Sequence, residues 1–228
     1  MNKNPKRRQF LKASAAMIPA AIVGKSTFLY AQEDGEEKIL DIFEKRRSVR
    51  EYLPTQVPAK HLNMILKAAA CAPTAGNQQP WKFLVIQSKE TIGKMRLACI
   101  ERSVARFQKN EHSAEEIEQN KVRTTEYYDK CFSAPTYIVV LTDGKSKYPT
   151  YNHWDGPLAA GYLILAARAL GYGTVHYTDS IPDEVTKSVL SIPDRYTRVT
   201  ITPLGIPKEW PDTPAKKSMD EMVNYESL

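Results

Sequence analysis

Three arginines and a serine gather within five residues, as Arg46, Arg47, Ser48 and Arg50. Guanidinium groups this close repel one another unless solvent or an anion satisfies them. Arginine is also the side chain best suited to planar, bidentate contact with phosphate. A solvated basic helix end would have the same composition. The cluster therefore indicates either an anion site, with phosphate as the preferred ligand, or an exposed charged surface.

A second stretch, residues 71–81, places the side-chain amides of Asn77, Gln78 and Gln79 among prolines and a glycine. An amide both donates and accepts hydrogen bonds, so it suits a heterocycle edge that alternates carbonyl and N–H groups. An ordinary helix-to-strand connection with capping amides explains the stretch equally well. Taken with the arginine cluster, the loop fits one ligand that has a phosphate tail and a heteroaromatic head.

Several other kinds of site are not indicated. Neither standard glycine-rich phosphate loop occurs, and there is no nucleophile elbow. The four histidines are scattered, and no pair of His or Cys residues has metal-ligand spacing. The sequence therefore predicts no metal site and no catalytic side-chain nucleophile.

The elements that carry these stretches predict an α+β fold. A short helix over 38–45 leads into the arginines, and a helix opened by Pro58 ends at the amide loop. Apolar runs predict two buried strands over 82–87 and 137–142, and shorter strands over 174–177 and 198–202. Further helices are expected over 90–108, 113–130, 157–170 and 183–190. Helices and strands do not alternate regularly, which favours α+β over a doubly wound sheet.

Two boundaries follow from proline positions. Pro157 is expected in the first turn of its helix, with Asp155 as the N-cap. From Pro203 to Leu228 the chain carries four prolines, which predicts an extended arm with one final helical turn.

Residues 1–31 have the pattern of an export signal, which leaves 32–228 as the folded domain. The run Lys6-Arg7-Arg8-Gln9-Phe10-Leu11-Lys12 precedes a mildly apolar segment, and Leu29-Tyr30-Ala31 offers a small residue for cleavage. The paired arginines resemble a twin-arginine signal. A basic amphipathic leader helix or an uncleaved anchor fits the same residues. We expect a periplasmic or otherwise extracytoplasmic protein.

The leader also explains the net charge of the chain. Residues 1–31 hold 6 of the 32 basic residues and no acidic residue, so 26 basic residues face 26 acidic ones in the remainder. A chain that starts near Gln32 is formally neutral. The basic balance is thus no evidence for nucleic-acid binding, and we expect none.

The three cysteines, Cys71, Cys99 and Cys131, are expected to be buried as small apolar residues. An odd number of cysteines cannot pair completely within one chain. One disulfide remains open, although no spacing supports it.

Four motifs in order resemble the FMN-dependent nitroreductase family. They are Arg46-Arg47-Ser48-Val49-Arg50, the run from Ala72 to Trp81, Leu170-Gly171-Tyr172-Gly173-Thr174, and Pro203-Leu204-Gly205-Ile206-Pro207. The resemblance covers nearly all of residues 36–225. It implies a central, mostly antiparallel sheet flanked by helices, in a domain-swapped homodimer with an extended C-terminal arm and two FMN sites at the interface.

The resemblance also implies roles for single residues. Arg46 and Ser48 would meet the phosphate and ribityl chain of FMN, and Arg50 the pyrimidine ring or the phosphate. Asn77 would hydrogen-bond the flavin ring, and Pro73 and Thr74 would reach it from the other subunit. Lys216 or Lys217 would hold the phosphate, and Thr178 stands near the reactive nitrogen where the family commonly has glycine. The predicted cofactor site comprises Arg46, Arg47, Ser48, Arg50, Pro73, Thr74, Asn77, Gln79, Thr178, Lys216 and Lys217.

The function implied is two-electron, ping-pong transfer through FMN to a small acceptor such as a nitroaromatic or a quinone. Relatives usually take electrons from NAD(P)H, whereas an exported protein is expected to need another donor, such as a redox partner or a quinone. Two alternatives stay open. One is a non-catalytic flavin-binding redox carrier, and the other is a family branch with dehydrogenase or flavin-modifying chemistry.

Overall fold

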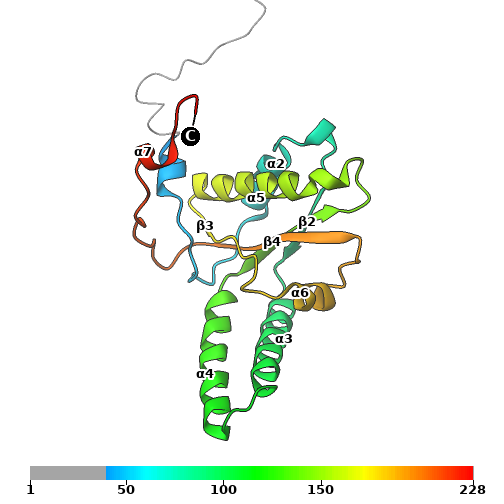
Figure 1. Cartoon of the computed structure of the whole chain (residues 1–228), viewed down its shortest axis with the longest axis vertical. Helices are drawn as coiled ribbons and strands as arrows, with labels where there is room; N and C mark the ends of the chain where they lie inside the picture. Colours follow the sequence, from blue (N-terminus) through cyan, green and yellow to red (C-terminus); the bar gives the residue numbers. More distant parts are fainter. Residues whose placement is uncertain (1–39, 228) are drawn as a thin grey trace, which may run out of the picture. The chain divides into compact units, whose positions relative to one another are not determined.

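Four strands form an antiparallel sheet at the centre of the computed structural model, which describes residues 40–227 (Figure 1). Their order across the sheet is β1-β2-β4-β3. The strands are β1 (Trp81–Ile86), β2 (Thr136–Asp143), β3 (Gly173–Thr174) and β4 (Tyr196–Gly205). The prediction of an α+β fold with an antiparallel sheet is confirmed. The predicted export signal, residues 1–31, lies outside the described residues.

Helices cover both faces of this sheet. Helices α2 and α5 lie on one face, and α3, α4 and α6 lie on the other (Figure 1). Residues 40–45 are also helical, next to the arginine cluster. The remaining helices are α2 (Ala59–Ala70), α3 (Lys89–Gln108), α4 (Ala114–Cys131), α5 (Asn152–Ala169), α6 (Asp183–Leu190) and the single turn α7 (Met219–Met222).

Strand β2 separates two hydrophobic cores, because successive side chains of a strand point to opposite faces. Ile138 and Val140 pack with α2 and α5, whereas Tyr137, Val139 and Leu141 pack with α3, α4 and α6. The continuous apolar run of β2 therefore reflects burial on both faces, as predicted.

Strand β1 was expected to be equally buried, and this is wrong. Lys82 is exposed, and the three residues after it are only partly buried. The reason is topological: β1 pairs with β2 alone and so forms one edge of the sheet. An apolar run does not by itself distinguish an edge strand from a central one.

Helix α5 begins earlier than predicted. It starts at Asn152, so Pro157 lies inside it and Asp155 lies in its first turn rather than at the N-cap. Contacts from neighbouring loops hold this extra turn: the Asn152 amide donates to the Asp143 carbonyl at 2.9 Å, and Asp155 accepts from the amide loop. The prediction failed because these contacts are tertiary.

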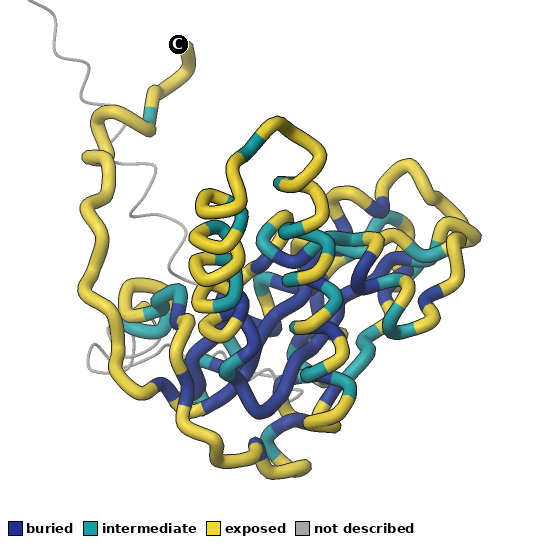
Figure 2. Tube along the Cα trace, turned by 90° about the horizontal axis from the view of Figure 1, so that it is seen from below, coloured by how far each residue is buried: buried dark blue, intermediate teal, exposed yellow. Residues whose placement is uncertain are grey.

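The C-terminal segment, residues 206–227, follows β4, which itself runs to Gly205 through Pro203. It is exposed over most of its length (Figure 2) and has α7 as its one α-helical turn. Among the residues described, no helix is both long and apolar enough to cross a membrane.

The cysteines divide into two groups. Cys99 and Cys131 are buried, at 0% and 3% exposure, whereas Cys71 is exposed. The prediction for Cys71 is therefore wrong, because α2 turns this residue outward at its C-terminal end. Burial raises the pKa of the Cys99 thiol to about 12 and also raises the pKa of Cys131.

Because the thiolate is the reactive form, we expect a maleimide at pH 8 to label Cys71 alone in the native protein. The full count of three thiols should react only in denaturant. Mass spectrometry of labelled peptides checks this, with Cys71→Ser as the control. Native labelling of Cys99 as fast as that of Cys71 would contradict the burial.

Candidate functional site

The arginine cluster lies on an extended segment beside the short strand β3. The Val49 N–H donates to the Thr174 carbonyl at 2.9 Å, and Ser48 pairs with Thr174 as a parallel bridge. Val49 is 1% exposed and points into the core. Side chains alternate along an extended chain, so Ser48 and Arg50 face the opposite way, outward. The core therefore fixes the direction of the polar side chains.

Gly173 allows Val49 and Pro207 to pack closely against strand β3. A Cβ at this position would lie 2.8 Å from the Cβ of Val49 and 2.8 Å from the Cγ of Pro207. Residue 173 is thus flanked by the arginine segment and the C-terminal segment. This packing explains physically why a glycine in Leu170–Thr174 belongs with the other motifs.

Two cavities share Arg46, Ser48 and Arg50. We call the first the cationic cavity; its volume is about 700 Å³. Its other lining residues are Phe43, Glu44, Arg47, Pro211, Asp212, Thr213, Pro214 and Lys216. The second, the helix cavity, has a volume of about 510 Å³ and is completed by Gly161, Ile164, Leu165, Val175 and His176. Arg46, Ser48 and Arg50 therefore line both the charged cationic cavity and the largely apolar helix cavity.

The cationic cavity is positively charged overall. Arg46, Arg47, Arg50 and Lys216 face Glu44 and Asp212, so four cations meet two carboxylates. Lys216 comes from the C-terminal segment, more than 160 positions after the arginines, whereas Lys217 does not line this cavity. The structure thus brings Lys216 and the arginine cluster together.

Arg47 differs from its neighbours because the protein occupies its guanidinium. It donates to the Arg46 carbonyl at 2.8 Å, to the Glu44 carbonyl and to the hydroxyl of Thr213. Arg47 therefore ties the C-terminal segment to the helix at 40–45. Arg50 reaches the Ser48 carbonyl only at 3.5 Å.

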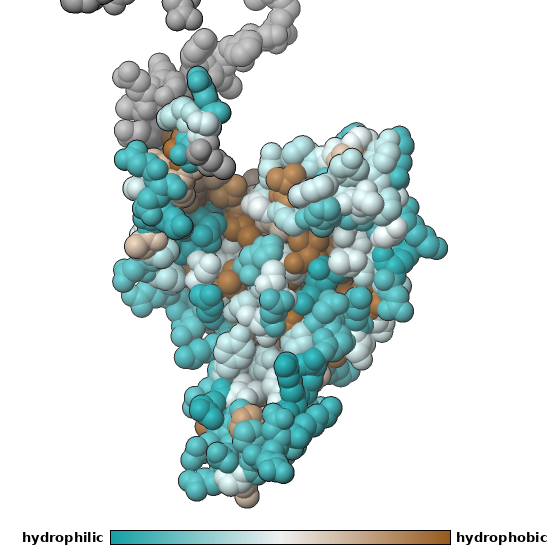
Figure 3. Space-filling model, viewed as in Figure 1, coloured by the Kyte–Doolittle hydropathy of each residue, from teal (hydrophilic) through white to brown (hydrophobic). Residues whose placement is uncertain are grey.

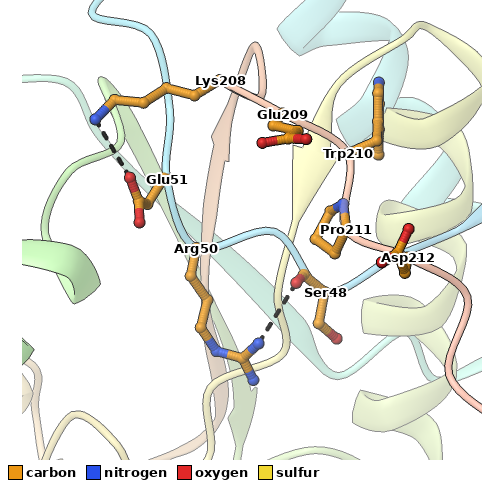
Figure 4. Close-up of a pocket in the computed structure, with 8 residues that line it drawn as sticks. All are labelled: Ser48, Arg50, Glu51, Lys208, Glu209, Trp210, Pro211 and Asp212. Atoms are coloured by element: carbon orange, nitrogen blue, oxygen red, sulfur yellow. Dashed lines mark hydrogen bonds and ion pairs between the residues drawn. The ribbon is translucent and has the colours of Figure 1, made fainter.

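The C-terminal segment is attached next to the cluster by backbone pairing. The Leu53 N–H donates to the Ile206 carbonyl at 2.8 Å, and the Lys208 N–H donates to the Glu51 carbonyl at 3.1 Å. Figure 4 shows the Lys208–Glu51 ion pair and the Arg50–Ser48 contact around a third hollow of about 580 Å³. This attachment brings Lys216 to the arginines.

Helix α5 forms the floor of the helix cavity. A Cβ built on Gly161 would meet no atom within 4 Å, so this glycine leaves open space on the helix surface. Ile164 and Leu165 continue the floor. Figure 3 shows hydrophobic residues gathered on the face of the molecule over α5. A planar apolar group fits against such a surface.

The amide loop is strained and held in place. Gly76, Asn77 and Gln79 have φ angles of 54°, 53° and 47°, in the left-handed region that side chains other than glycine rarely adopt. Gln78 anchors them: its Nε2 donates to Asp155 Oδ2 at 2.7 Å, and its Oε1 accepts the Tyr148 N–H at 2.7 Å. Strain of this kind is concentrated at functional sites.

The structure assigns different tasks to the amides of this loop. Gln78 is used entirely within the protein, so it positions the loop. Asn77 and Gln79 are exposed, and Gln79 Nε2 donates to Asn77 Oδ1 at 3.0 Å. The Thr74 hydroxyl accepts the Gln79 N–H at 3.2 Å. Asn77 and Gln79 are the amides that a ligand can reach.

Within one chain, all of the predicted site residues except Thr178 and Lys217 fall into two groups. Arg46, Arg47, Ser48, Arg50 and Lys216 meet at the cavities. Pro73, Thr74, Asn77 and Gln79 lie at the start of α5, and neither cavity is lined by them. Thr178 follows β3, and its carbonyl accepts from Arg198 at 2.7 Å.

Sequence reasoning did not single out His176, and it did not predict that Gln78 and Asp155 hold the amide loop together. Asp155 is 4% exposed and accepts both Gln78 and the Ala75 N–H, the latter at 3.1 Å. His176 lines the helix cavity. His176 is exposed between the buried residues Val175 and Tyr177, and no motif in the sequence singles it out. Among the described residues, no group of three or more His, Cys, Asp or Glu could hold a metal ion.

Removing the Asp155 carboxylate should release the loop. Asp155→Ala loses two charge-assisted hydrogen bonds, and we expect the free energy of unfolding to fall by about 2–4 kcal/mol. Asp155→Asn keeps one acceptor and should lose about half as much. Urea unfolding followed by circular dichroism measures both. A loss below about 0.5 kcal/mol for Asp155→Ala would show that the loop is held by other contacts.

Comparisons with known proteins agree on one family. The family model described as "Nitroreductase family" matches residues 43–206. An iodotyrosine deiodinase from Thermotoga neapolitana is 32% identical over 179 residues, which cover 78% of this chain and 91% of that protein. A protein from Archaeoglobus fulgidus, named as a candidate NADH dehydrogenase/NAD(P)H nitroreductase, is 32% identical over 182 residues, with 77% and 89% covered.

A solved structure is similar as well. It is that of oxidised iodotyrosine deiodinase bound to FMN and 3-iodo-L-tyrosine, with a TM-score of 0.67 and 27% sequence identity. The match covers 83% of this chain and 100% of that chain.

Proposed function

The chain belongs to the nitroreductase family, and on this basis we propose that it is an FMN-binding oxidoreductase that passes two electrons to a small aromatic or quinone acceptor. The observation that carries the proposal is that Arg46, Ser48, Arg50 and Lys216 meet beside the open floor that Gly161 leaves on α5. Bound FMN supplies the redox chemistry, taking electrons from a donor and releasing them to an acceptor in two half-reactions.

The residues present fit FMN in both charge and shape. Ligand sites in proteins commonly enclose about 300–1,000 Å³, which includes both cavities. The cationic cavity suits the phosphate, because three arginines and Lys216 line it. The helix cavity suits the ring, because Gly161 leaves open space above its floor. The shared Arg46, Ser48 and Arg50 would then face the junction between the two parts.

Each side chain can be given a task. Arg46 and Lys216 would hold the phosphate, with Lys216 acting as a point charge. Ser48 would donate its hydroxyl to the ribityl chain. Arg50 would place positive charge near the ring, where it would stabilise an anionic ring. Arg47 holds the C-terminal segment in place, since Thr213 and two carbonyls engage it.

The site is completed by a second copy of the chain in our proposal. Asn77, Gln79, Pro73 and Thr74 lie apart from the cavities in one chain, so they would serve the FMN of the partner. An exposed apolar surface that includes Leu158 and Tyr162 on α5 supports a symmetric dimer. In such a dimer the extended C-terminal segment would pack against the partner subunit.

Mixing two variants with weakened FMN binding tests the shared site. Arg46→Ala and Asn77→Gly damage the two groups separately, and glycine tolerates the backbone of residue 77. If subunits share sites, a refolded mixture contains dimers with one undamaged site and regains bound FMN. A mixture with no more FMN than the separate variants would contradict sharing.

We also propose export through the twin-arginine route, on the basis of Lys6 to Lys12 and the apolar segment that follows. That route carries folded proteins, so FMN could be inserted before transport. The electron donor would then be a redox partner or a quinone in place of NAD(P)H. Fractionation of cells that carry an Arg7→Lys, Arg8→Lys variant tests the route: retention in the cytoplasm supports it, and unchanged export contradicts it.

A second candidate function is reductive removal of iodine from an iodotyrosine. Similarity favours it, because an iodotyrosine deiodinase is among the relatives and the similar solved structure contains 3-iodo-L-tyrosine. The chemically reduced holoprotein should be offered 3-iodotyrosine, a nitroaromatic and a quinone in turn. Iodide release identifies deiodination, and reduction of the others supports the first proposal. Reoxidation by none of them would indicate a redox carrier.

A further inference from the structure

His176 lines the helix cavity together with Arg46, Ser48 and Arg50. It is the second residue after β3, and its neighbours Val175 and Tyr177 are both buried at 5% and 4% exposure. His176 itself is exposed and lines the cavity, so its side chain is accessible to a ligand there. Of the described residues that line this cavity, His176 alone has an ordinary pKa close to neutral pH.

The surroundings of the imidazole contain no carboxylate from any lining element. The segment 46–50 contributes the cations Arg46 and Arg50, and α5 contributes Gly161, Ile164 and Leu165 without charge. Solvent reaches His176 through the cavity, but the protein behind it desolvates the ring and lowers the pKa below its usual value of 6.5. His176 is thus neutral at pH 7 when the cavity holds no anion.

We propose that His176 is the group that couples proton uptake to the redox state of the bound ring, so that an anionic ring in the helix cavity draws a proton onto the imidazole. This inference rests on the proposed function. Arg50 is always positively charged, so it stabilises an anion in the cavity at every pH. At pH 7, His176 becomes positively charged only when an anionic ring occupies the cavity.

Reduction of the neutral ring by two electrons and one proton would give an anionic reduced ring. The neighbouring negative charge raises the affinity of His176 for a proton, and a second proton then binds at the imidazole. Over the pH range between the oxidised-state and reduced-state pKa values of His176, two protons accompany two electrons. Below that range the imidazole already carries its proton, and above it the imidazole takes up none, so in both cases one proton accompanies the two electrons.

The midpoint potential reports this count. A two-electron couple shifts by about 30 mV for each tenfold change in its equilibrium constant. The potential should therefore fall by about 60 mV per pH unit where two protons are taken up and by about 30 mV per pH unit where one is taken up. The break between these slopes belongs to His176 if the proposal is correct.

Redox titration of the full-chain holoprotein between pH 5 and 8.5 tests the proposal against His176→Gln. His112→Gln is the matched control, because His112 stacks on Phe107 at the turn of the α3–α4 hairpin, outside the cavity. We expect the break in the wild type and in His112→Gln, and a single slope of about 30 mV per pH unit in His176→Gln.

A second readout is the NMR titration of the His176 ring in oxidised and reduced wild-type protein. The pKa of His176 should be higher in the reduced protein than in the oxidised protein. Because this measurement uses only the wild type, it does not depend on whether His176→Gln folds. An unchanged His176 pKa, or the same break in His176→Gln, would overturn the inference while leaving FMN binding intact. A protein that binds no FMN would overturn the proposed function as well.

Discussion

Arg46→Ala should weaken FMN binding by roughly 10- to 150-fold, because a hydrogen bond to a charged group contributes about 1.5–3 kcal/mol. Arg46 lines both cavities, and no hydrogen bond or ion pair of its side chain is found within residues 40–227. Its guanidinium is therefore available to a ligand, unlike that of Arg47. Fluorescence titration of the flavin-free protein with FMN measures the change.

The matched control is Arg123→Ala on α4, which also removes one arginine from the surface but lies on the α3–α4 hairpin. It should bind FMN as the wild type does. Raising the salt concentration should weaken wild-type binding more than binding by Arg46→Ala. Salt screens the ionic contact between Arg46 and the phosphate, and the variant has already lost that contact. Equal affinities for wild type and Arg46→Ala would show that the phosphate lies elsewhere.

Gly161→Phe should yield folded protein without flavin. The added ring has open space, since a Cβ at residue 161 meets nothing within 4 Å, and that space is the floor of the helix cavity. The substitution also replaces a glycine inside a helix, where glycine costs about 1 kcal/mol relative to alanine. The fold should therefore be retained while the place for the flavin ring is filled.

Two further variants sharpen this result. Gly161→Ala adds one methyl group and should raise the free energy of unfolding by about 0.5–1 kcal/mol. Gly93→Phe places the same ring on α3, where a Cβ also meets nothing, and should keep its flavin. Flavin content and thermal unfolding of the purified variants decide the matter. Full flavin content in Gly161→Phe would show that the flavin ring does not bind in this cavity.

Local pattern was sufficient for the main elements of the fold. The apolar run of β2 and the apolar face of α2 (Leu62, Ile65, Ala69) record burial directly, because their periods match a strand and a helix. The start of α5 and the edge position of β1 could not be predicted, because they depend on partners distant in sequence. Proline at residue 157 gave a misleading boundary for the same reason.

The candidate site shows the same division. The arginines could be predicted as a possible anion site because their charge is visible in the sequence. The resemblance to the family implied FMN, which a similar solved structure contains. The roles of Gln78 and Asp155 were not predictable, since only the folded loop reveals that they bond to each other at 2.7 Å. His176 was missed because a residue that lines a cavity can be recognised only after the cavity is known.

The most direct test of the whole account is the absorbance spectrum of the purified full chain beside that of an Arg46→Ala, Asn77→Ala double variant. We predict a yellow wild-type protein that releases one FMN per chain on denaturation, and a colourless double variant. A colourless wild type that cannot be reconstituted with FMN would contradict the account and leave a nitroreductase fold without its chemistry.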